Sequence, residues 1–344
     1  LLSNGNLAVR NLPDDSICII DLNRHALVDK LKGEDFGLRG PYNIALLSNG
    51  NLAVGDIYDS SICIIDLNRR KLVNRLKGEF VLSVPYDITV LSDGKLAVCN
   101  YVDDCIGIID QSTGKLVNKL KGEDFGLRLP YGITVLPDGN LAVCNRVHNS
   151  ISIIEFEEKR REIKLDYTKP KETRVLKEGL ELNHPAGSVR LTRGRYSGNI
   201  AVYNLGDNSI SIIDPNRGKL VDKLKGEDFG LSQPNDIALL SDGNLAVCNV
   251  RDKCICIIDL DRQKLVDKLK GGDFGLKVPC NIMLLSNGNL AVCNWGDNSI
   301  SIIDPERRKL VDRLEGKDFG LREIYHITLP VSYTHLRAHE TGRN

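Results

Sequence analysis

The sequence predicts an all-β protein, a β-propeller of seven four-stranded blades. First, a turn signature of Ser or Pro, Asn or Asp, and Gly, followed by Asn or Lys and then Leu-Ala-Val, recurs about every 45 residues. Second, each period contains short β-rich segments separated by turn residues. Third, the middle segments are apolar on both faces, which is expected where sheets pack face to face around an axis rather than in a sandwich.

The period that starts at Pro130 shows how the strands are assigned. Its first three expected strands, separated by a hairpin turn in which Gly139 supplies the positive φ and by a polar turn, are residues 130–136, 141–144 and 150–154. In other periods a fourth segment follows, such as residues 264–270, where Leu and Val lie at helical spacing. Seven residues closed by Gly271 are too few for a stable helix, so we predict an outer-edge strand whose lysines prevent unwanted pairing.

The two ends of the repeat are expected to close the ring. The repeat begins inside a first strand and ends with a lone first strand, residues 325–329. Pairing of this strand with the three N-terminal strands would complete the seventh blade and leave no open sheet edge. Residues 1–329 are thus expected to form one propeller domain, a monomeric part of a longer chain, in which six or eight blades remain alternatives.

The last residues depart from the repeat. Residues 331–341 resemble the translation of an adapter used in sequencing libraries, and the expected turn signature is missing after Leu329. Residues 330–344 are therefore interpreted as a non-native tail and are left out of the argument on fold.

Composition excludes several classes of protein. Lys plus Arg and Asp plus Glu both number 46, so no global field gathers nucleic acid or an anionic membrane. No apolar run is long enough for a membrane-spanning helix. The ten Cys lie within apolar strand patterns and form no Cys-x-x-Cys, which predicts small, reduced core residues and a cytoplasmic protein.

Two segments carry a resemblance to known repeat families. Residues 130–145, Pro-Tyr-Gly-Ile-Thr-Val-Leu-Pro-Asp-Gly-Asn-Leu-Ala-Val-Cys-Asn, resemble an NHL repeat. Residues 298–316, which begin Asn-Ser-Ile-Ser-Ile-Ile-Asp-Pro, are similar to the YVTN class of propeller repeat. The resemblance covers nearly all of residues 1–329 and implies a WD40-like propeller fold. It implies little about function, because these families include scaffolds, RNA binders, extracellular sensors and a few enzymes.

One blade diverges from the others around residues 155–197. About 14 additional residues separate Gly139 from Gly198, compared with the usual period. From Glu155 to Arg195 we expect a Lys- and Arg-rich run to replace the fourth strand. A solvated loop is the simplest interpretation, and a docking loop for an acidic partner is the alternative.

Two rings of equivalent residues recur around the propeller. In each blade, the second strand ends at an Asn or Asp that is expected to bond the backbone of its own turn: Asn11, Asp56, Asn100, Asn145, Asn204, Asn249 and Asn294. Residues at the entry to the innermost strands are expected to face the channel near one mouth: Asn43, Asp87, Gly132, Asp236, Asn281 and His326. A metal or small polar ligand could bind there, but carboxylates are few and Gly132 interrupts the ring, so we assign no metal.

Differences among the copied blades mark a candidate binding rim. The residue after each ring Asn or Asp varies and includes Tyr101, Arg146 and Trp295. The loops carrying Tyr42, Tyr86 and Tyr131 are expected on the same rim. Aromatic and Arg side chains are typical anchors for a protein partner, although tyrosines packed beneath the loops are an alternative. Trp295, the single Trp, is the strongest candidate, whereas His148 is interpreted as surface variation rather than a base.

The functional expectation follows from what the repeats lack. The sequence contains no phosphate-binding loop, zinc-protease motif, nucleophile elbow or EF-hand. Near-identical blades supply rings of one residue rather than the asymmetric cluster that catalysis needs. We therefore expect a non-enzymatic scaffold that binds a protein or peptide through its rim, with no cofactor and no membrane contact. The alternatives are an RNA-binding propeller and a lactonase- or lyase-like enzyme with a metal held by Asp87, Asp236 and His326.

Overall fold

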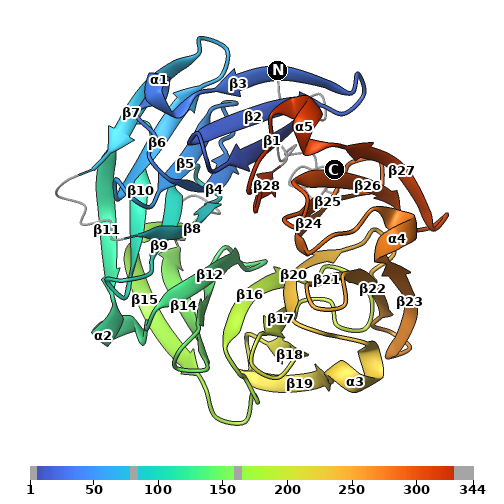
Figure 1. Cartoon of the computed structure of the whole chain (residues 1–344). Coiled ribbons are helices and arrows are strands. Elements are labelled where there is room, and N and C mark those ends of the chain that lie inside the picture. The colour runs from blue at the N-terminus through green and yellow to red at the C-terminus, as the bar shows by residue number, and fades with distance from the viewer. Residues whose placement is uncertain (1–5, 78–83, 159–164, 329–344) are drawn as a thin grey trace, which may run out of the picture.

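The computed structural model describes residues 6–77, 84–158 and 165–328, and these form seven four-stranded antiparallel sheets. The sheets are arranged as blades around a central axis (Figure 1). Each blade runs from an inner strand to an outer strand in chain order, except that the blade at the chain ends has the order β28-β1-β2-β3. This architecture confirms the predicted fold class and blade number.

The strands fall into four concentric sets. The inner strands are β4 (Pro41–Leu46), β8 (Pro85–Val90), β12 (Pro130–Val135), β16 (Pro185–Arg190), β20 (Pro234–Leu239), β24 (Pro279–Leu284) and β28 (Ile327–Thr328). The second strands are β1 (Asn6–Asn11), β5 (Leu52–Asp56), β9 (Leu96–Asn100), β13 (Leu141–Asn145), β17 (Ile200–Asn204), β21 (Leu245–Asn249) and β25 (Leu290–Asn294).

The two outer sets complete each blade. The third strands are β2 (Ser16–Asp21), β6 (Ser61–Asp66), β10 (Cys105–Asp110), β14 (Ser150–Glu158), β18 (Ser209–Asp214), β22 (Cys254–Asp259) and β26 (Ser299–Asp304). The outermost strands are β3 (Ala26–Leu31), β7 (Lys71–Leu76), β11 (Lys115–Lys121), β15 (Leu165–Leu176), β19 (Lys219–Leu224), β23 (Lys264–Lys270) and β27 (Lys309–Leu314). The Lys-Leu-Val segments are therefore strands, as predicted.

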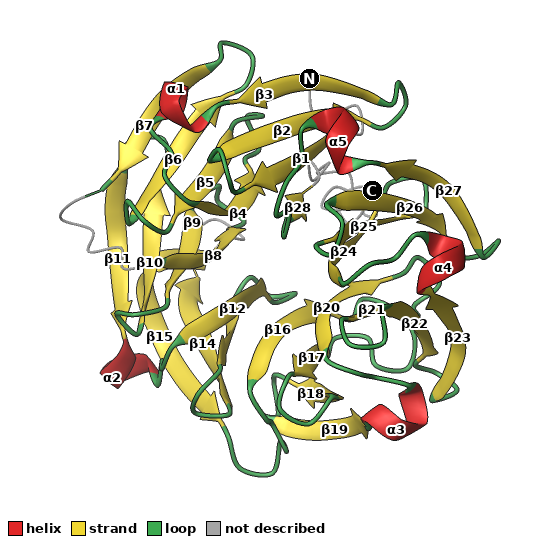
Figure 2. Ribbon diagram, viewed as in Figure 1, coloured by secondary structure: helices red, strands yellow, loops and turns green. Residues whose placement is uncertain are grey.

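In the described part of the chain, single-turn helices follow five of the outermost strands, and Figure 2 shows them at the perimeter. They are α1 (Gly33–Phe36), α2 (Gly122–Phe125), α3 (Gly226–Phe229), α4 (Gly271–Phe274) and α5 (Gly316–Phe319). Each ends at a Gly in the left-handed region, such as Gly37 with φ 64°, whose N–H bonds the first carbonyl of the helix. None of these helices, nor any other in the described ranges, has the length and apolarity needed to cross a membrane.

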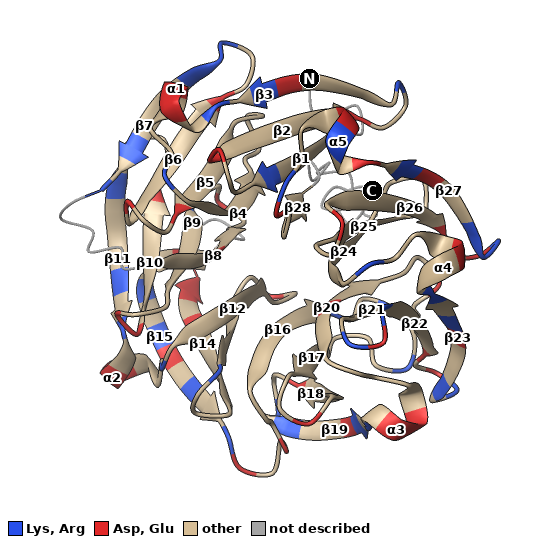
Figure 3. Ribbon diagram, viewed as in Figure 1, with Lys and Arg blue, Asp and Glu red and all other residues tan. Residues whose placement is uncertain are grey.

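The core lies between the blades. One cluster, for example, joins Ile17 and Leu31 of one blade to Ile44 and Leu52 of the next. Burying each such side chain contributes about 1.5–3 kcal/mol. All ten Cys are buried, as expected for small core residues. Charged residues gather on the outermost strands, whereas most inner strands carry no charged residue (Figure 3).

Two residue pairs between β1 and β28 close the blade that joins the two ends of the repeat. In the register of β1 and β28, Ala8 lies opposite Thr328 and Val9 opposite Ile327. The Arg10 N–H adds a bond of 3.3 Å to the carbonyl of His326. The predicted closure by strands from both ends of the repeat is therefore confirmed. The expected tail, residues 330–344, lies outside the described residues.

The expectation that the divergent blade loses its fourth strand is wrong. The strand β15 is present and, at 12 residues, is longer than the other outermost strands in the described chain. It pairs with β14 from Ile151↔Leu176 to Glu158↔Leu165, with bulges near Phe156. Phe156 and Tyr167 pack face to edge at 4.9 Å, which buries apolar surface that a Lys- and Arg-rich loop would lack. The basic residues before Leu165 lie outside the described residues.

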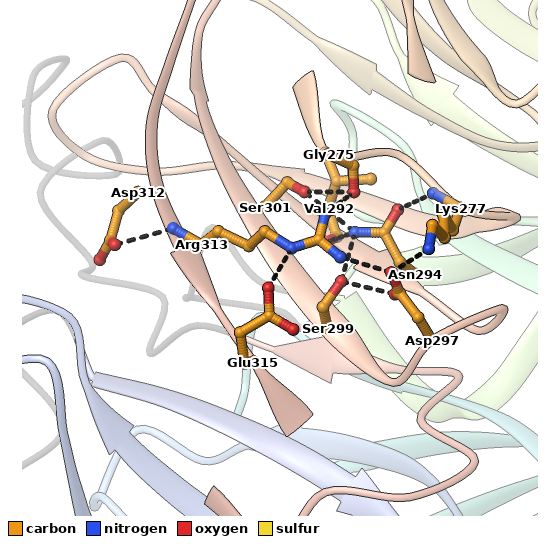
Figure 4. Close-up of polar contacts among 10 residues, drawn as sticks. All are labelled: Gly275, Lys277, Val292, Asn294, Asp297, Ser299, Ser301, Asp312, Arg313 and Glu315. Atoms are coloured by element: carbon orange, nitrogen blue, oxygen red, sulfur yellow. Dashed lines mark hydrogen bonds and ion pairs between the residues drawn. The ribbon is translucent and has the colours of Figure 1, made fainter. Parts of the chain in front are cut away.

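Polar contacts on the outer strands tie neighbouring segments together (Figure 4). Arg313 on β27 donates to the Gly275 carbonyl, to Asp297 and to Glu315, the last at 2.7 Å. Arg75 on β7 similarly donates to the Phe36 carbonyl at 2.5 Å. Each arginine therefore links its blade to the end of the helix that follows the preceding blade.

Candidate binding site at the channel mouth

Irregular pairing of the inner strands turns two consecutive side chains toward the channel. In β8, Pro85 pairs with Asn100 and Asp87 with Cys99, so Tyr86 has no partner in the ladder. In a regular strand, consecutive side chains point to opposite faces, whereas a bulge re-aims them. Tyr86 and Asp87 accordingly both line one hollow at the channel mouth.

The same bulge recurs in neighbouring blades. Tyr131 is unpaired between Pro130 and Gly132 in β12, and Tyr42 and Asn43 are both unpaired between Pro41 and Ile44 in β4. The proline at the start of each strand has no N–H to donate, which favours irregular pairing at this point. The repeat therefore builds a row of mouth-facing side chains from one local irregularity.

Three tyrosines of this row form a continuous hydrogen-bonded chain. The Tyr42 hydroxyl donates to the Tyr86 hydroxyl at 2.5 Å, which donates to the Tyr131 hydroxyl at 2.7 Å. The ring centroids of these neighbours lie 4.6 and 4.3 Å apart. Burial raises the pKa of all three phenols above the ordinary tyrosine value, so they remain protonated donors.

Two loop residues complete what we name the tyrosine platform, consisting of Tyr42, Tyr86, Tyr131, Tyr101 and Arg146. The Tyr101 ring lies 5.3 Å from Tyr86 and 6.1 Å from Tyr131. The Arg146 guanidinium lies 4.8 Å from the centre of the Tyr131 ring. The structure thus joins five of the predicted rim residues into one surface. These side chains are half-buried, so they are neither fully exposed on the rim nor fully packed beneath the loops.

The two other rim candidates lie apart from the platform. Trp295 is 53% exposed, and its backbone N–H bonds the Val278 carbonyl at 3.1 Å. His148 is exposed in the loop after β13. Within the described ranges neither ring stacks on another aromatic ring, so Trp295 is available to a partner but is not part of the tyrosine platform.

Asp87 joins two blades through backbone N–H groups. Its Oδ1 accepts from the N–H of Ile88 and from the amide of Asn43, both at 2.9 Å. Its Oδ2 accepts from the Ile133 N–H in the next blade, also at 2.9 Å. Burial nevertheless raises the pKa of Asp87 to about 6, although these bonds act in the opposite direction.

Asp236 repeats this arrangement on another part of the ring. Its Oδ1 accepts from the Ile237 N–H at 2.9 Å, and its Oδ2 accepts from the Asn281 amide at 2.6 Å and the Ile282 N–H at 3.0 Å. Burial raises the pKa of Asp236 to about 7, with a smaller contribution from the charge of Asp87. The Asn281 Oδ1 in turn accepts from the Ile327 N–H at 3.0 Å, which extends the link into the closing blade.

The gap in the ring at Gly132 has a steric cause. A Cβ at Gly132 would lie 2.6 Å from the Ala186 carbonyl oxygen, because β12 and β16 approach closely. The equivalent residue of β16 is Gly187, where a Cβ would lie 2.7 Å from the Tyr203 ring. Tyr203 thus occupies the space that ring side chains take elsewhere, and it lines the hollow.

A buried arginine, Arg10, lies behind two tyrosines of the channel mouth. Arg10 is 2% exposed, and its guanidinium lies 4.8 Å from the Tyr42 ring and 5.6 Å from the Tyr325 ring. It donates to the Tyr42 carbonyl at 3.3 Å. Burial and then the charge of Arg10 lower the pKa of His326 to about 4, so this histidine is neutral at physiological pH.

The hollow enclosed by these residues has a volume of about 180 Å³. This is smaller than a typical drug-sized pocket and fits one side chain or a small polar molecule. Among the residues that the structure describes, no three His, Cys, Asp or Glu side chains are grouped so that they could hold a metal ion. Asp87, Asp236 and His326 all line the hollow, but they do not form such a group.

The other ring has a structural role, although mostly not through the expected bond. The Asn294 Oδ1 accepts from the Lys277 N–H at 3.0 Å, and its amide donates to Ser301, also at 3.0 Å (Figure 4). Asn145 and Asn249 likewise accept from backbone N–H groups of the segment that enters their own blade. The ring residues other than Asn100 therefore fix the entering segment. Two of them also bond the turn that follows: Asp56 accepts from the Asp59 N–H, which is the expected bond, and the Asn11 amide donates to the Asp14 carboxylate.

Sequence reasoning missed Arg10 and Tyr203 as mouth residues. Both occupy the penultimate position of the second strand, where Cys99, Cys144 and Cys248 stand in other blades. Comparison of the blades at this position, one residue before the ring Asn or Asp, would have identified these two large side chains among four Cys and Gly55. The small thiol leaves space at the mouth, which a larger side chain fills.

Comparison with known proteins supports the fold and no specific family. No protein-family model matches the sequence, and comparison with curated protein sequences gives no match. Many solved structures are similar in fold. A catalytically inactive variant of virginiamycin B lyase from Staphylococcus aureus with quinupristin has 19% identity and a TM-score of 0.63, covering 86% of this chain and 84% of that one.

Two further solved structures have higher TM-scores. A candidate 6-phosphogluconolactonase from Bacteroides fragilis has 16% identity and a TM-score of 0.67, over 95% of this chain and 99% of that one. Hydrazine synthase from Kuenenia stuttgartiensis has 17% identity and a TM-score of 0.67, over 88% and 93%. The chain is therefore a seven-bladed propeller that resembles lyase- and lactonase-type propellers, and at these identities the likeness extends to the fold alone.

Proposed function

We propose that this protein is a binding propeller that recognises a peptide or a protein segment at the channel mouth. The observation that carries this proposal is the tyrosine platform, in which five side chains from three blades form one surface beside a hollow. Tyr and Arg are enriched among residues that contribute most to protein interfaces. Their hydrogen-bonded, stacked arrangement is rigid before binding, so little conformational entropy is lost when a partner docks.

The size and position of the hollow support a peptide ligand. A volume of about 180 Å³ accommodates one side chain of a partner whose backbone lies across the platform. Trp295, 53% exposed on the same rim, offers a second contact outside the platform. The resemblance of the repeats to NHL and YVTN propellers is compatible with a binding role, since scaffolds occur in these families.

A displayed library of random peptides tests this proposal. Peptides enriched on the protein should bind at least tenfold more weakly to Tyr101→Ala and Arg146→Ala. Arg307→Ala is the matched control, because Arg307 lies in a turn at the opposite end of the blades and is 84% exposed. Failure to enrich any peptide, or enriched peptides that bind the two platform variants as well as the control, would refute the proposal.

A second candidate function, a lyase or hydrolase reaction in the channel, has a specific observation in its favour. The neutral ring of His326 shares the hollow with two carboxyl groups whose pKa values lie near neutrality, which suits general acid and base chemistry. Ring opening of a panel of lactones and cyclic peptide lactones, followed by mass spectrometry, would reveal such activity. Activity retained in His326→Gln would exclude His326 as the general base.

A further inference from the structure

The hollow beside the tyrosine platform contains two carboxyl groups without a cationic partner. Asp87 and Asp236 both line it, and neither forms an ion pair with a Lys, Arg or His of the described residues. Each carboxyl accepts three hydrogen bonds, two of them from backbone N–H groups. Because a carboxylate offers about four acceptor positions, each retains about one for a ligand.

Aromatic side chains form much of the remaining wall. The phenol rings of Tyr42, Tyr86, Tyr131, Tyr203 and Tyr325 line the hollow. The face of a tyrosine attracts a cation within about 6 Å. The protein already uses these rings in this way, since the guanidinium groups of Arg10 and Arg146 lie over Tyr42 and Tyr131.

We propose that the hollow receives one ammonium or guanidinium group, carried by a Lys or Arg side chain of the partner. The proposal rests on the proposed function for the class of partner and adds the chemistry of the inserted group. A cation would supply the charge that the two carboxylates lack, whereas an anion would lie against both of them. A neutral group would leave the buried carboxylate charges uncompensated.

Charges on the surrounding elements set the pH dependence of this site. The phenols of Tyr42, Tyr86, Tyr131, Tyr203 and Tyr325 stay neutral because burial raises their pKa values. Burial, with a smaller contribution from the charge of Asp87 or Asp236, raises the pKa of the Cys99, Cys144 and Cys248 thiols, and Cys280 also lines the hollow.

Three basic groups also face this region. His326 is neutral above about pH 4, and two arginines lie against the mouth wall: Arg10 behind Tyr42 and Tyr325, and Arg146 over Tyr131. The carboxyl groups of Asp87 and Asp236 therefore dominate titration of the hollow near neutrality. A cation must displace their protons, so its binding strengthens from pH 5 to pH 8.

Single amino-acid analogues test the proposal without a peptide. The probes are N-acetyl-L-arginine methylamide, N-acetyl-L-lysine methylamide and the neutral N-acetyl-L-citrulline methylamide, titrated by NMR against the full chain. At least one cationic analogue should bind at least tenfold more tightly than citrulline, and more tightly at pH 8 than at pH 5. Asp87→Asn and Asp236→Asn should each weaken binding at least tenfold, whereas Glu34→Gln, which neutralises an exposed carboxylate on α1, should not.

The outcomes separate this inference from the proposed function. Binding of both cationic analogues no tighter than that of the citrulline analogue, no binding of either cationic analogue, or binding unchanged in both Asp variants would overturn it. Two Asp variants are used because either one alters a bond between blades, and circular dichroism identifies any that is unfolded. A selected peptide that still binds the mouth after all its Lys and Arg residues are replaced would also overturn it, while leaving the mouth as the peptide-binding surface.

Discussion

Replacing Asp236 with Asn should change how the free energy of unfolding depends on pH. The pKa of this carboxyl group is ordinarily 3.8 and rises to about 7 in the folded protein, because burial disfavours its charge. Between pH 5 and pH 7 the folded protein therefore holds a proton that the unfolded chain has released. A raised carboxyl pKa means that stability falls as pH rises through this window, by about 1.4 kcal/mol per pH unit.

The expected magnitude follows from the width of the window. From pH 5 to pH 8, ionisation of Asp236 should lower the unfolding free energy of the wild-type protein by about 2–3 kcal/mol. Asn does not ionise, so the variant lacks this loss. Its amide group can accept from Asn281 and Ile282 but then presents an N–H to Ile237, which costs about 1–3 kcal/mol at every pH.

Urea unfolding followed by circular dichroism at pH 5 and pH 8 measures this difference. When the pH is raised from 5 to 8, the unfolding free energy of Asp236→Asn should rise by about 2–3 kcal/mol relative to that of wild type. Glu34→Gln, an exposed carboxylate with the same change of charge, should gain less than about 0.5 kcal/mol. A difference between Asp236→Asn and wild type that is the same at both pH values would refute the assignment of a buried, uncompensated carboxyl group.

Three further predictions concern other parts of the molecule. Burial lowers the pKa of His326 from 6.5 to about 4, a shift that costs stability as pH falls through this window. When the pH is lowered from 8 to 5, the unfolding free energy of His326→Gln should therefore rise by about 2 kcal/mol relative to that of wild type in the same urea assay. No such relative rise would contradict the burial of a neutral ring. Arg313→Ala should lower the unfolding free energy by about 2–3 kcal/mol, because Arg313 is 20% exposed and bonds two carboxylates and one backbone carbonyl. In the control Arg307→Ala, whose side chain is 84% exposed in wild type, the loss should be less than about 0.5 kcal/mol. Equal losses in these two variants would exclude the proposed link between blades. A chain ending at Arg322 lacks β28 and should melt several degrees lower and self-associate through the exposed edge of β1 in light scattering, unlike a chain ending at Thr328; identical behaviour of the two chains would show that this strand does not close the ring.

The repeat made the blades predictable from sequence. The Gly turns, the apolar middle strands and the lone last strand each state a local preference that the global fold satisfies, as in the pairing of Val9 with Ile327. The rim position of Tyr101 and Arg146 followed from the same alignment of blades. Their contact with Tyr86 and Tyr131 did not, because it depends on the bulges that re-aim these two tyrosines within their inner strands.

Other features were hidden for identifiable physical reasons. The bulge at Tyr86 leaves no mark in the alternation of side chains, yet it brings Tyr86 and Asp87 to one surface. Arg10 occupies an apolar strand, where its charge is compensated by aromatic faces rather than by a carboxylate. The strand β15 has a polar composition that favours a loop, and pairing with β14 outweighs that preference.

Hydroxyl-radical footprinting of the protein bound to a selected peptide tests most directly whether the mouth is the recognition surface. Mass spectrometry would quantify oxidation of Tyr101, Tyr86 and Tyr131 with and without peptide, and of His25, which lies in a turn at the opposite end of the blades and is 46% exposed. Protection of the three tyrosines with unchanged oxidation of His25 is the expected result. Protection confined to His25 or to the outermost strands, with the tyrosines oxidised as before, would contradict recognition at the mouth.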